Sequence, residues 1–330
     1  MIVRPATVAD VDGLIDLARL LDTMNLPHDP VAVRQMIDDS QAAFTGSPRG
    51  EGNYTLVAED AGRIMGTATL IARHGTPTKP HYYLELVERP IVSSQLDVSY
   101  IRHLLRLGKD ETPRTELSGL VVHPEARGQG LGKLLLAARL LVVAARPDWF
   151  CERLIAELLP PLREDGGNAF WDAMGGALTG MAYYRADRLC RMDKRFIEDL
   201  FPRGDVILEL LPQAAQDLVG QVGTATAPIK ALLERAGFHE LHTIDPFDGG
   251  PHLGATRSEI HPIARSQELV VLDTPPGELL QSMVLLEPRS FHVVTADVAV
   301  IGRGIRVTTA TTKQLEISPG DPLWAMPLDW

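Results

Sequence analysis

Several features are scarce in this sequence, and each absence narrows the kind of protein that it can encode. The 330 residues include two cysteines, Cys151 and Cys190, which provide neither a disulfide framework nor a zinc-binding spacing. The net charge is −11 and no block of lysine or arginine occurs, so the chain lacks the basic footprint of a nucleic-acid-binding protein. We therefore expect no metal site and no nucleic-acid partner.

Long apolar runs are scarce as well. The longest, Leu134–Ala145, is interrupted by Arg139 and is shorter than the roughly 20 residues that a membrane span requires. The N-terminal stretch MIVRPATVADVD contains acidic residues and no apolar core, unlike a signal peptide. These features predict a cytoplasmic protein without membrane association, in a reducing compartment where both cysteines are small buried groups.

The most informative stretch is ELSGLVVHPEARGQGLGKLLLAARLLVVAAR, residues 116–146. Glu116–Val122 predicts a short buried strand, and His123-Pro124 ends it because the residue before a proline is disfavoured in the α region. The glycines of Arg127–Gly132 permit a sharp turn. An apolar helix follows, and the free amides at its beginning form a ready anion-binding site.

The rest of the chain predicts a mixed α+β protein. Strands are expected at Ile2–Arg4, Tyr54–Asp60, Arg63–Ala72, Tyr82–Val87 and Leu154–Leu159. Helices are expected near 8–21, 30–44, 168–174, 213–221 and 227–236. Between the third and fourth of these lie the stretch MAYYRADR (181–188) and a short amphipathic segment at 195–200, and a loop is expected at Asp245–Leu253. Beyond residue 255, β-branched runs at Glu268–Leu272, Ser290–Ile301, Ile305–Thr312 and Leu323–Leu328 predict a small all-β domain. The expected domains are therefore 1–255 and 256–330.

The turn and its surroundings resemble a known family. The pattern R-x-x-G-x-G, preceded by V-x-H-P and followed by a leucine-rich helix, resembles the acyl-CoA pyrophosphate turn of GNAT acyltransferases. Longer blocks resemble the arginine N-succinyltransferase family, in the same order along the chain: FWDAMGG, MAYYRAD, KRFIEDLFP, LLPQAAQDLVGQVG, LLERAGF and IDPFDGGPHL. The resemblance covers residues 1–255 well and the β-rich tail loosely. It implies a GNAT-type core, with a mixed, largely antiparallel sheet flanked by helices, and helical insertions.

The resemblance also implies an activity and a cofactor site. Members transfer a succinyl group from succinyl-CoA, a co-substrate rather than a permanently bound cofactor, to the α-amino group of arginine or ornithine in arginine catabolism. They often work as homo- or hetero-oligomers. The implied acyl-CoA contacts are the strand end and the turn, namely Leu120, Val121, Val122, Arg127, Gly128, Gln129, Gly130, Leu131 and Gly132. Lys133 could reach a CoA phosphate or belong to a solvated helix face.

The transfer chemistry requires few side chains. An α-amino group has a pKa near 7.7–8, so a modest general base is sufficient to deprotonate it. Glu116 could act as this base or bind the acceptor's ammonium group, unless it is a surface carboxylate at the strand end. Tyr183 and Tyr184 could protonate the leaving thiolate, as a tyrosine does in many GNAT enzymes, or serve in packing.

Three further residues are candidates for binding the acceptor. Asp187 matches an Ala-Asp pair of the family and could bind a guanidinium group with both oxygens, or cap a helix. Asp248 and His252 lie in the Gly/Pro-rich stretch DPFDGGPHL, which could line a site or form a structural turn.

One departure from the family concerns the proton donor. The family's proposed proton-donor histidine follows G-x-V, and this position is Gly223 here, which has no side chain to donate a proton. Three functions therefore stay open: the family's own activity, a GNAT N-acyltransferase with another acyl-CoA or amine, and a catalytically weak subunit of a hetero-oligomer.

Overall fold

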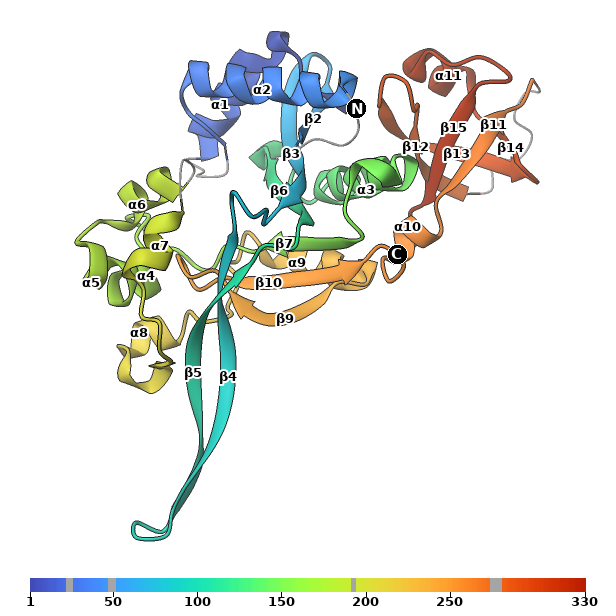
Figure 1. The fold of residues 1–330 in the computed structure, drawn as a ribbon. Coiled ribbons are helices and arrows are strands. Elements are labelled where there is room, and N and C mark those ends of the chain that lie inside the picture. Colours follow the sequence, from blue (N-terminus) through green and yellow to red (C-terminus); the bar gives the residue numbers. More distant parts are fainter. Residues whose placement is uncertain (22–25, 47–51, 191–193, 274–280) are drawn as a thin grey trace.

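The protein is described by a computed structural model that covers residues 1–21, 26–46, 52–190, 194–273 and 281–330, without the side chains of Leu21, Asp187 and Arg188 (Figure 1). Its central sheet has the order β1-β2-β3-β6-β7-β10-β9. These strands are β1 (Ile2–Pro5), β2 (Asn53–Asp60), β3 (Arg63–His74), β6 (Arg114–Val122), β7 (Arg153–Glu157), β10 (Pro251–Thr256) and β9 (His239–Ile244). Strands β6 and β7 run parallel, whereas the other neighbouring pairs are antiparallel. This is the GNAT-type sheet that the resemblance implies.

Helices cover both faces of this sheet. On one face, the short 3-10 helix η1 (Val8–Asp10) leads into α1 (Val11–Leu21), which packs beside α2 (Pro30–Thr45). On the other face lie α3 (Leu131–Ala145) and α9 (Ala227–Ala236). Side chains of a strand alternate between faces: Val57 packs beneath α1 and α2, whereas Leu56 belongs to the cluster around α3.

A long hairpin extends away from the rest of the molecule (Figure 1). It consists of β4 (His81–Ser93) and β5 (Val98–Asp110), which pair along their whole length, and its base joins the central sheet through β9. The sequence predicted a strand only at Tyr82–Val87. The outer part was missed because both of its faces are largely exposed, so its side chains carry no alternation of apolar and polar residues.

Helical segments form a second apolar cluster around Trp171, beside the base of the hairpin. They are α4 (Ala169–Ala173), α5 (Gly175–Thr179), α6 (Tyr183–Cys190), α7 (Arg195–Leu200) and α8 (Gln213–Gln216), with the short elements β8 (Val206–Ile207) and η4 (Leu208–Leu210). The helix predicted at 213–221 thus ends at residue 216. The predicted loop Asp245–Leu253 is also shorter than expected, since β10 begins at Pro251.

The C-terminal part forms a small closed β-barrel. Its strands follow the order β12-β15-β11-β14-β13, and β12 also pairs with β13. They are β11 (Gln267–Val271), β12 (Gln281–Leu286), β13 (Val293–Ile301), β14 (Gly304–Arg306) and β15 (Pro322–Pro327). The predicted small β domain is thus confirmed as a barrel, and two short helices accompany its strands, α10 (His261–Ala264) and α11 (Thr309–Leu315). The predicted strand Ile305–Thr312 is interrupted because the Thr308 side chain accepts a hydrogen bond from the Thr311 amide and begins α11.

The barrel packs against the rest of the protein. Val284, Phe291 and Met326 belong to the same apolar cluster as α3, and Val293 of β13 pairs with Val3 of β1. The division of the chain at residue 255 therefore stays a prediction. Within the described residues, no helix is long and apolar enough to cross a membrane.

Candidate active site

A large cleft opens where the parallel strands β6 and β7 separate. Their pairing is confined to Thr115 with Leu154 and Glu116 with Ile155. From there toward their carboxyl ends, both strands line a cleft of about 1730 Å³. Sites for one small ligand measure roughly 300–1,000 Å³, so this cleft has room for two substrates.

A β-bulge faces the middle of the cleft. Thr67 of β3 pairs with Val121 and Thr69 pairs with Ser118, so that Gly119 and Leu120 both lie opposite one residue of β3. Gly119 adopts a φ of +60°, which glycine tolerates and which the bulge requires. A bulge leaves backbone groups outside the ladder of hydrogen bonds. Here those groups can bind a carbonyl oxygen in the cleft.

The glycine-rich turn lies at one end of the cleft. It follows the 3-10 helix η2 (Pro124–Ala126) and leads into α3, with Gly128 and Gly130 at φ of +75° and +84°. The first intrahelical bond runs from the Leu134 amide to the Gly130 carbonyl, so the amides before it are free of the helix ladder. The positive end of a buried helix therefore faces the cleft, as a site for phosphate requires.

The implied CoA contacts are placed as follows. Leu120, Val121, Val122, Arg127, Gly128, Gly130, Leu131, Gly132 and Lys133 all line the cleft, whereas Gln129 does not. The side chain of Val121 packs into the cluster beneath α1. Lys133 is half-buried, and its Nζ donates to the backbone oxygens of Leu328 at 2.7 Å and Trp330 at 2.6 Å. It is therefore not part of a solvated helix face, and its role toward CoA stays a prediction.

Carboxylates gather at the other end of the cleft. Glu116 and Glu157 line it, and His74 lies between them, with Nδ1 at 3.0 Å from Glu116 Oε2 and Nε2 at 3.3 Å from Glu157 Oε1. Burial lowers the pKa of His74, but Glu116 and Glu157 outweigh it and raise the pKa to about 10. Glu116 is buried, so the alternative of a surface carboxylate is wrong.

Lys194 is the cation within this acidic end. It lines the cleft with Asp245 and Asp248. Burial lowers the pKa of Lys194, but the charges of Glu157 and Asp245 outweigh it, and the pKa is raised overall. Burial raises the pKa of Asp245 to about 6, and burial together with the charge of Asp245 raises the pKa of Asp248 well above its usual value. Sequence patterns did not single out Glu157, Lys194 or Asp245.

The other candidate residues are divided between the cleft and its surroundings. Tyr183 is buried, lines the cleft and has its hydroxyl 3.5 Å from Asp248 Oδ2, whereas Tyr184 is 62% exposed and lies outside the lining. His252 lies on β10 behind the lining, with Nδ1 3.1 Å from Thr243 Oγ1, and burial lowers its pKa to about 3. Asp187 falls on α6, and its side chain lies outside the described part of the chain. The roles of these residues stay predictions.

Arg139 is a buried cation beside the bulge. It lies within α3, is 1% exposed, and its Nη1 donates to the Ser118 carbonyl at 3.3 Å. Among the described residues, no carboxylate lies within ion-pair distance of it, and burial lowers its pKa to about 9. The sequence contained a signal that could have identified Arg139 as a candidate site residue, because it is the one charged residue in the longest apolar run.

The splayed parallel strands, the bulge and the glycine turn before a buried helix define an acyl-CoA-dependent N-acyltransferase of the GNAT type. A family model described as arginine N-succinyltransferase beta subunit matches residues 1–262. The chain belongs to the arginine N-succinyltransferase family.

Individual relatives agree with this assignment. The chain is 31% identical to the arginine N-succinyltransferase subunit beta of Pseudomonas aeruginosa, over 99% of this chain and 98% of that protein. It is 30% identical to an arginine N-succinyltransferase of Escherichia coli, over 97% of this chain and 96% of that protein. The solved structure of the arginine/ornithine succinyltransferase subunit AI from Pseudomonas aeruginosa matches with a TM-score of 0.85 at 26% identity, covering 100% of this chain and 99% of that one.

A charge placed in the turn tests the anion site. At Gly132 an added Cβ meets no atom within 4 Å and φ is not positive, so Gly132→Asp is expected to fold. An acidic residue in the first turn stabilises a helix but repels a pyrophosphate. We expect acyl-CoA affinity, measured by calorimetry, to fall about 10- to 100-fold, which corresponds to about 1.4–2.8 kcal/mol. Gly204→Asp is the matched control, because Gly204 also has open space around it; equal affinities of the two variants would contradict the assignment.

Proposed function

We propose that this chain transfers a succinyl group from succinyl-CoA to the α-amino group of arginine, or of ornithine. The observation that carries this is the charge complementarity of one cleft, which has a buried arginine beside the bulge and carboxylates at the end away from the turn. The names of the family and of its members support the same pair of substrates.

Arg139 favours an acyl group that carries a carboxylate. A buried cation without an anionic partner is costly, and an anion from the substrate offsets this cost. The side chain donates to the carbonyl of Ser118, one residue before the bulge. If the thioester lies against the bulge, the far carboxylate of a succinyl group is within the same part of the cleft. An acetyl group has no such carboxylate.

The acidic end favours an acceptor with positive charge. Negative charges outnumber positive ones among the residues that line this end, where Glu116, Glu157 and Asp245 lie near Lys194. Arginine brings an ammonium and a guanidinium group, and a guanidinium binds carboxylates through paired hydrogen bonds. These carboxylates and the bulge share one cleft, which supports a pose in which the amine of a bound acceptor lies beside the thioester.

The proposed reaction follows from this placement. The α-ammonium group loses its proton, with Glu116 as acceptor or as partner of the ammonium. The neutral amine attacks the thioester carbonyl carbon, and the oxyanion is stabilised by backbone amides of the bulge at Gly119 and Leu120. When the C–S bond breaks, the CoA thiolate takes a proton, for which Tyr183 is the candidate donor, and the former amine nitrogen loses its second proton as the amide forms, which balances the proton that Tyr183 gives. Holding both substrates in place supplies much of the acceleration.

A thiol-release assay tests the proposed function. Succinyl-CoA and acetyl-CoA are each combined with arginine, ornithine and other amines, and free CoA is measured over time. Release with succinyl-CoA and arginine or ornithine is the expected result. Release of CoA with a different pair would show that the enzyme is an N-acyltransferase with substrates other than those proposed.

Gly223 keeps a weakly active subunit open as a second candidate. It lines the cleft, and an added Cβ would meet the Pro160 carbonyl oxygen at 3.1 Å. A histidine at this position would require the neighbouring backbone to shift, so the family's proton donor has no direct replacement there. Acyl-CoA binding without release of CoA by any pair would favour this second function.

We infer further that the chain works as an oligomer and that the β4–β5 hairpin contributes the contact. Val92, Leu96, Tyr100 and Ile101 are 77%, 71%, 45% and 51% exposed on it. They lie on both faces of the outer part of the hairpin, exposed apolar side chains of this kind are typical of interaction sites, and the Pseudomonas aeruginosa relative is itself named as a subunit. The partner is a second copy or a different subunit.

Val92→Asp tests self-association through the hairpin. An unpaired charge in an interface costs several kcal/mol, so we expect light scattering to show a smaller species, with dissociation at least about 30-fold more favourable. Val31→Asp is the matched control, because Val31 of α2 is 76% exposed. A wild-type chain that is monomeric when purified alone would contradict self-association.

A further inference from the structure

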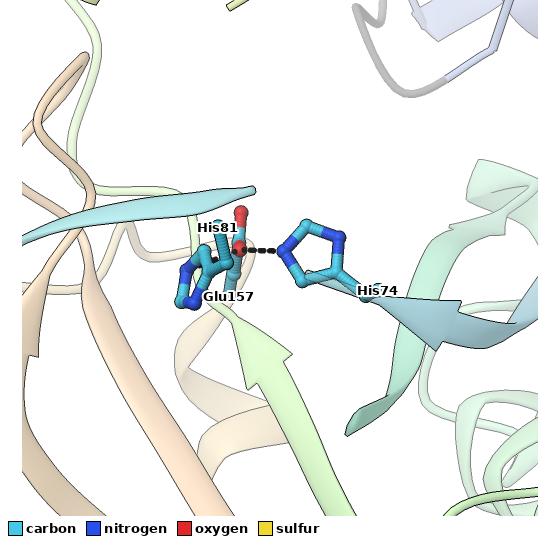
Figure 2. A group of neighbouring side chains, drawn as sticks. All are labelled: His74, His81 and Glu157. Carbon is cyan, nitrogen blue, oxygen red and sulfur yellow. Dashed lines mark ion pairs between the residues drawn. The ribbon is translucent and has the colours of Figure 1, made fainter. Parts of the chain in front are cut away.

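Two histidines and a glutamate converge behind the acidic end of the cleft. His74 is the last residue of β3, His81 is the first residue of β4, and Glu157 ends β7 (Figure 2). Their donor atoms all lie within 4.8 Å of one another. Glu157 Oε1 is 3.3 Å from His74 Nε2 and 3.1 Å from His81 Nε2.

These atoms are close but poorly satisfied. His74 Nε2, His81 Nε2 and Glu157 Oε1 are each buried without an aligned hydrogen bond, and the His81 side chain is 3% exposed. Buried polar groups that lack an aligned hydrogen bond are rare in folded proteins, and each one calls for an explanation. Here two imidazoles meet a single carboxylate oxygen, and one ligand bonded to all three atoms would account for this arrangement.

We propose that His74, His81 and Glu157 bind a divalent transition-metal ion, with Zn²⁺ as the best fit. Two imidazole nitrogens and one carboxylate oxygen form a known ligand set of catalytic zinc sites, which keep a further position for water or substrate. Ligands about 2.0–2.1 Å from a tetrahedral ion lie about 3.3 Å from one another. The distances of 3.1 and 3.3 Å agree with this spacing.

The surroundings support a metal rather than a chance contact. Metal-binding histidines usually donate their second ring nitrogen to a carboxylate, which sets the ring's orientation. Here His74 Nδ1 lies 3.0 Å from Glu116 Oε2. The short connection between the histidines is held by reciprocal backbone hydrogen bonds between Thr76 and Lys79. Gly75 has φ of +80°, and a Cβ there would meet the His81 Cβ at 3.1 Å, so the two strand ends approach closely.

The charge balance also favours a cation. Glu116, Glu157 and Asp245 lie around this point, opposed by Lys194 and by the proton that Glu116 and Glu157 hold on His74 when its pKa is raised, and a bound cation would replace that proton. The donor atoms of Glu157, Asp245 and His252 form a second group within 4.8 Å, so Asp245 can supply a further ligand. Because Glu157 lines the cleft, a bound ion would lie in the wall of the proposed acceptor end. The sequence predicted no metal site, since the ligands come from three strands.

Metal binding is tested on the full chain without substrates, so its outcome is independent of the proposed function. The protein is freed of metal with a chelator and titrated with Zn²⁺, and the visible absorption of bound Co²⁺ is recorded. We expect one equivalent of Zn²⁺, a higher melting temperature with Zn²⁺, and a Co²⁺ spectrum typical of a tetrahedral site. Glu116 would be an outer-sphere partner, since it contacts His74 and not the ion, and loss of such a partner lowers metal affinity about 10- to 100-fold. We expect Glu116→Gln to lower the affinity for Zn²⁺ by this factor. We expect His74→Gln and His81→Gln, which remove a ligand, to lower it by at least the same factor.

His103→Gln is the matched control, because His103 lies on β5 with a side chain that is 52% exposed. Its affinity for Zn²⁺ should equal that of the wild type. Circular dichroism establishes that each variant is folded. The proposal is overturned if wild-type protein shows no Zn²⁺-dependent shift in melting temperature and no Co²⁺ spectrum, or if His74→Gln and His81→Gln bind Zn²⁺ as tightly as His103→Gln.

Discussion

Replacing Arg139 with methionine is expected to lower kcat/KM for succinyl-CoA by about 100-fold or more. Loss of one partner of a buried charge pair costs roughly 2–5 kcal/mol, and each 1.4 kcal/mol corresponds to a factor of ten. Methionine keeps an unbranched apolar chain within α3, where Arg139 is buried. Removing a buried charge that has no ion-pair partner among the residues that the structure describes should not destabilise the fold.

The comparison with acetyl-CoA identifies the cause of this loss. Acetyl-CoA has no carboxylate, so its kcat/KM should change little in Arg139→Met, and the preference for succinyl-CoA should disappear. Arg19→Met is the control, because Arg19 is an exposed residue of another helix, α1. An equal decrease with both acyl-CoAs would show that Arg139 supports the helix and does not recognise the acyl carboxylate.

The second large effect is expected for Glu116→Gln. Whether Glu116 takes the proton from the acceptor or binds its ammonium group, the amide keeps the shape and loses the charge. General-base catalysis contributes about 10²- to 10⁴-fold, so we expect kcat/KM for the amine to fall within this range. Affinity for acyl-CoA, measured without the amine, should stay within about threefold, since the proposed phosphate site is the turn at the other end of the cleft.

A matched substitution separates this effect from a general loss of carboxylates. Glu268 is exposed on β11 of the barrel, and Glu268→Gln should leave both measurements unchanged. Unaltered turnover in Glu116→Gln would exclude Glu116 from the reaction. The search for the base would then move to Glu157, the other carboxylate beside His74.

Local signals predicted the strand, turn and helix at one end of the cleft well. Strand β6, the glycine-rich turn and helix α3 are consecutive, and each is encoded by neighbouring residues: an apolar run, a proline, glycines and a second apolar run. Such signals act over a few residues and need no distant partner. The outer β4–β5 hairpin and helix α11 had no comparable signal. In the hairpin both faces are exposed, and in α11 a side-chain cap overrides a run of threonines with strand preference.

The sequence by itself determined the family, the mixed α+β fold and the position of the glycine turn, because these depend on local order along the chain. Only the tertiary structure decided which side chains meet at the acceptor end. His74 and His81 are seven residues apart, but the other residues of this group come from distant segments and share no short spacing with them, namely Glu157, Lys194 and Asp245. Pairing of β6 with β7, of β7 with β10, and of β4 with β9 brings their ends together. Contacts between strands depend on how the sheet is ordered, and no local pattern of residues encodes that order.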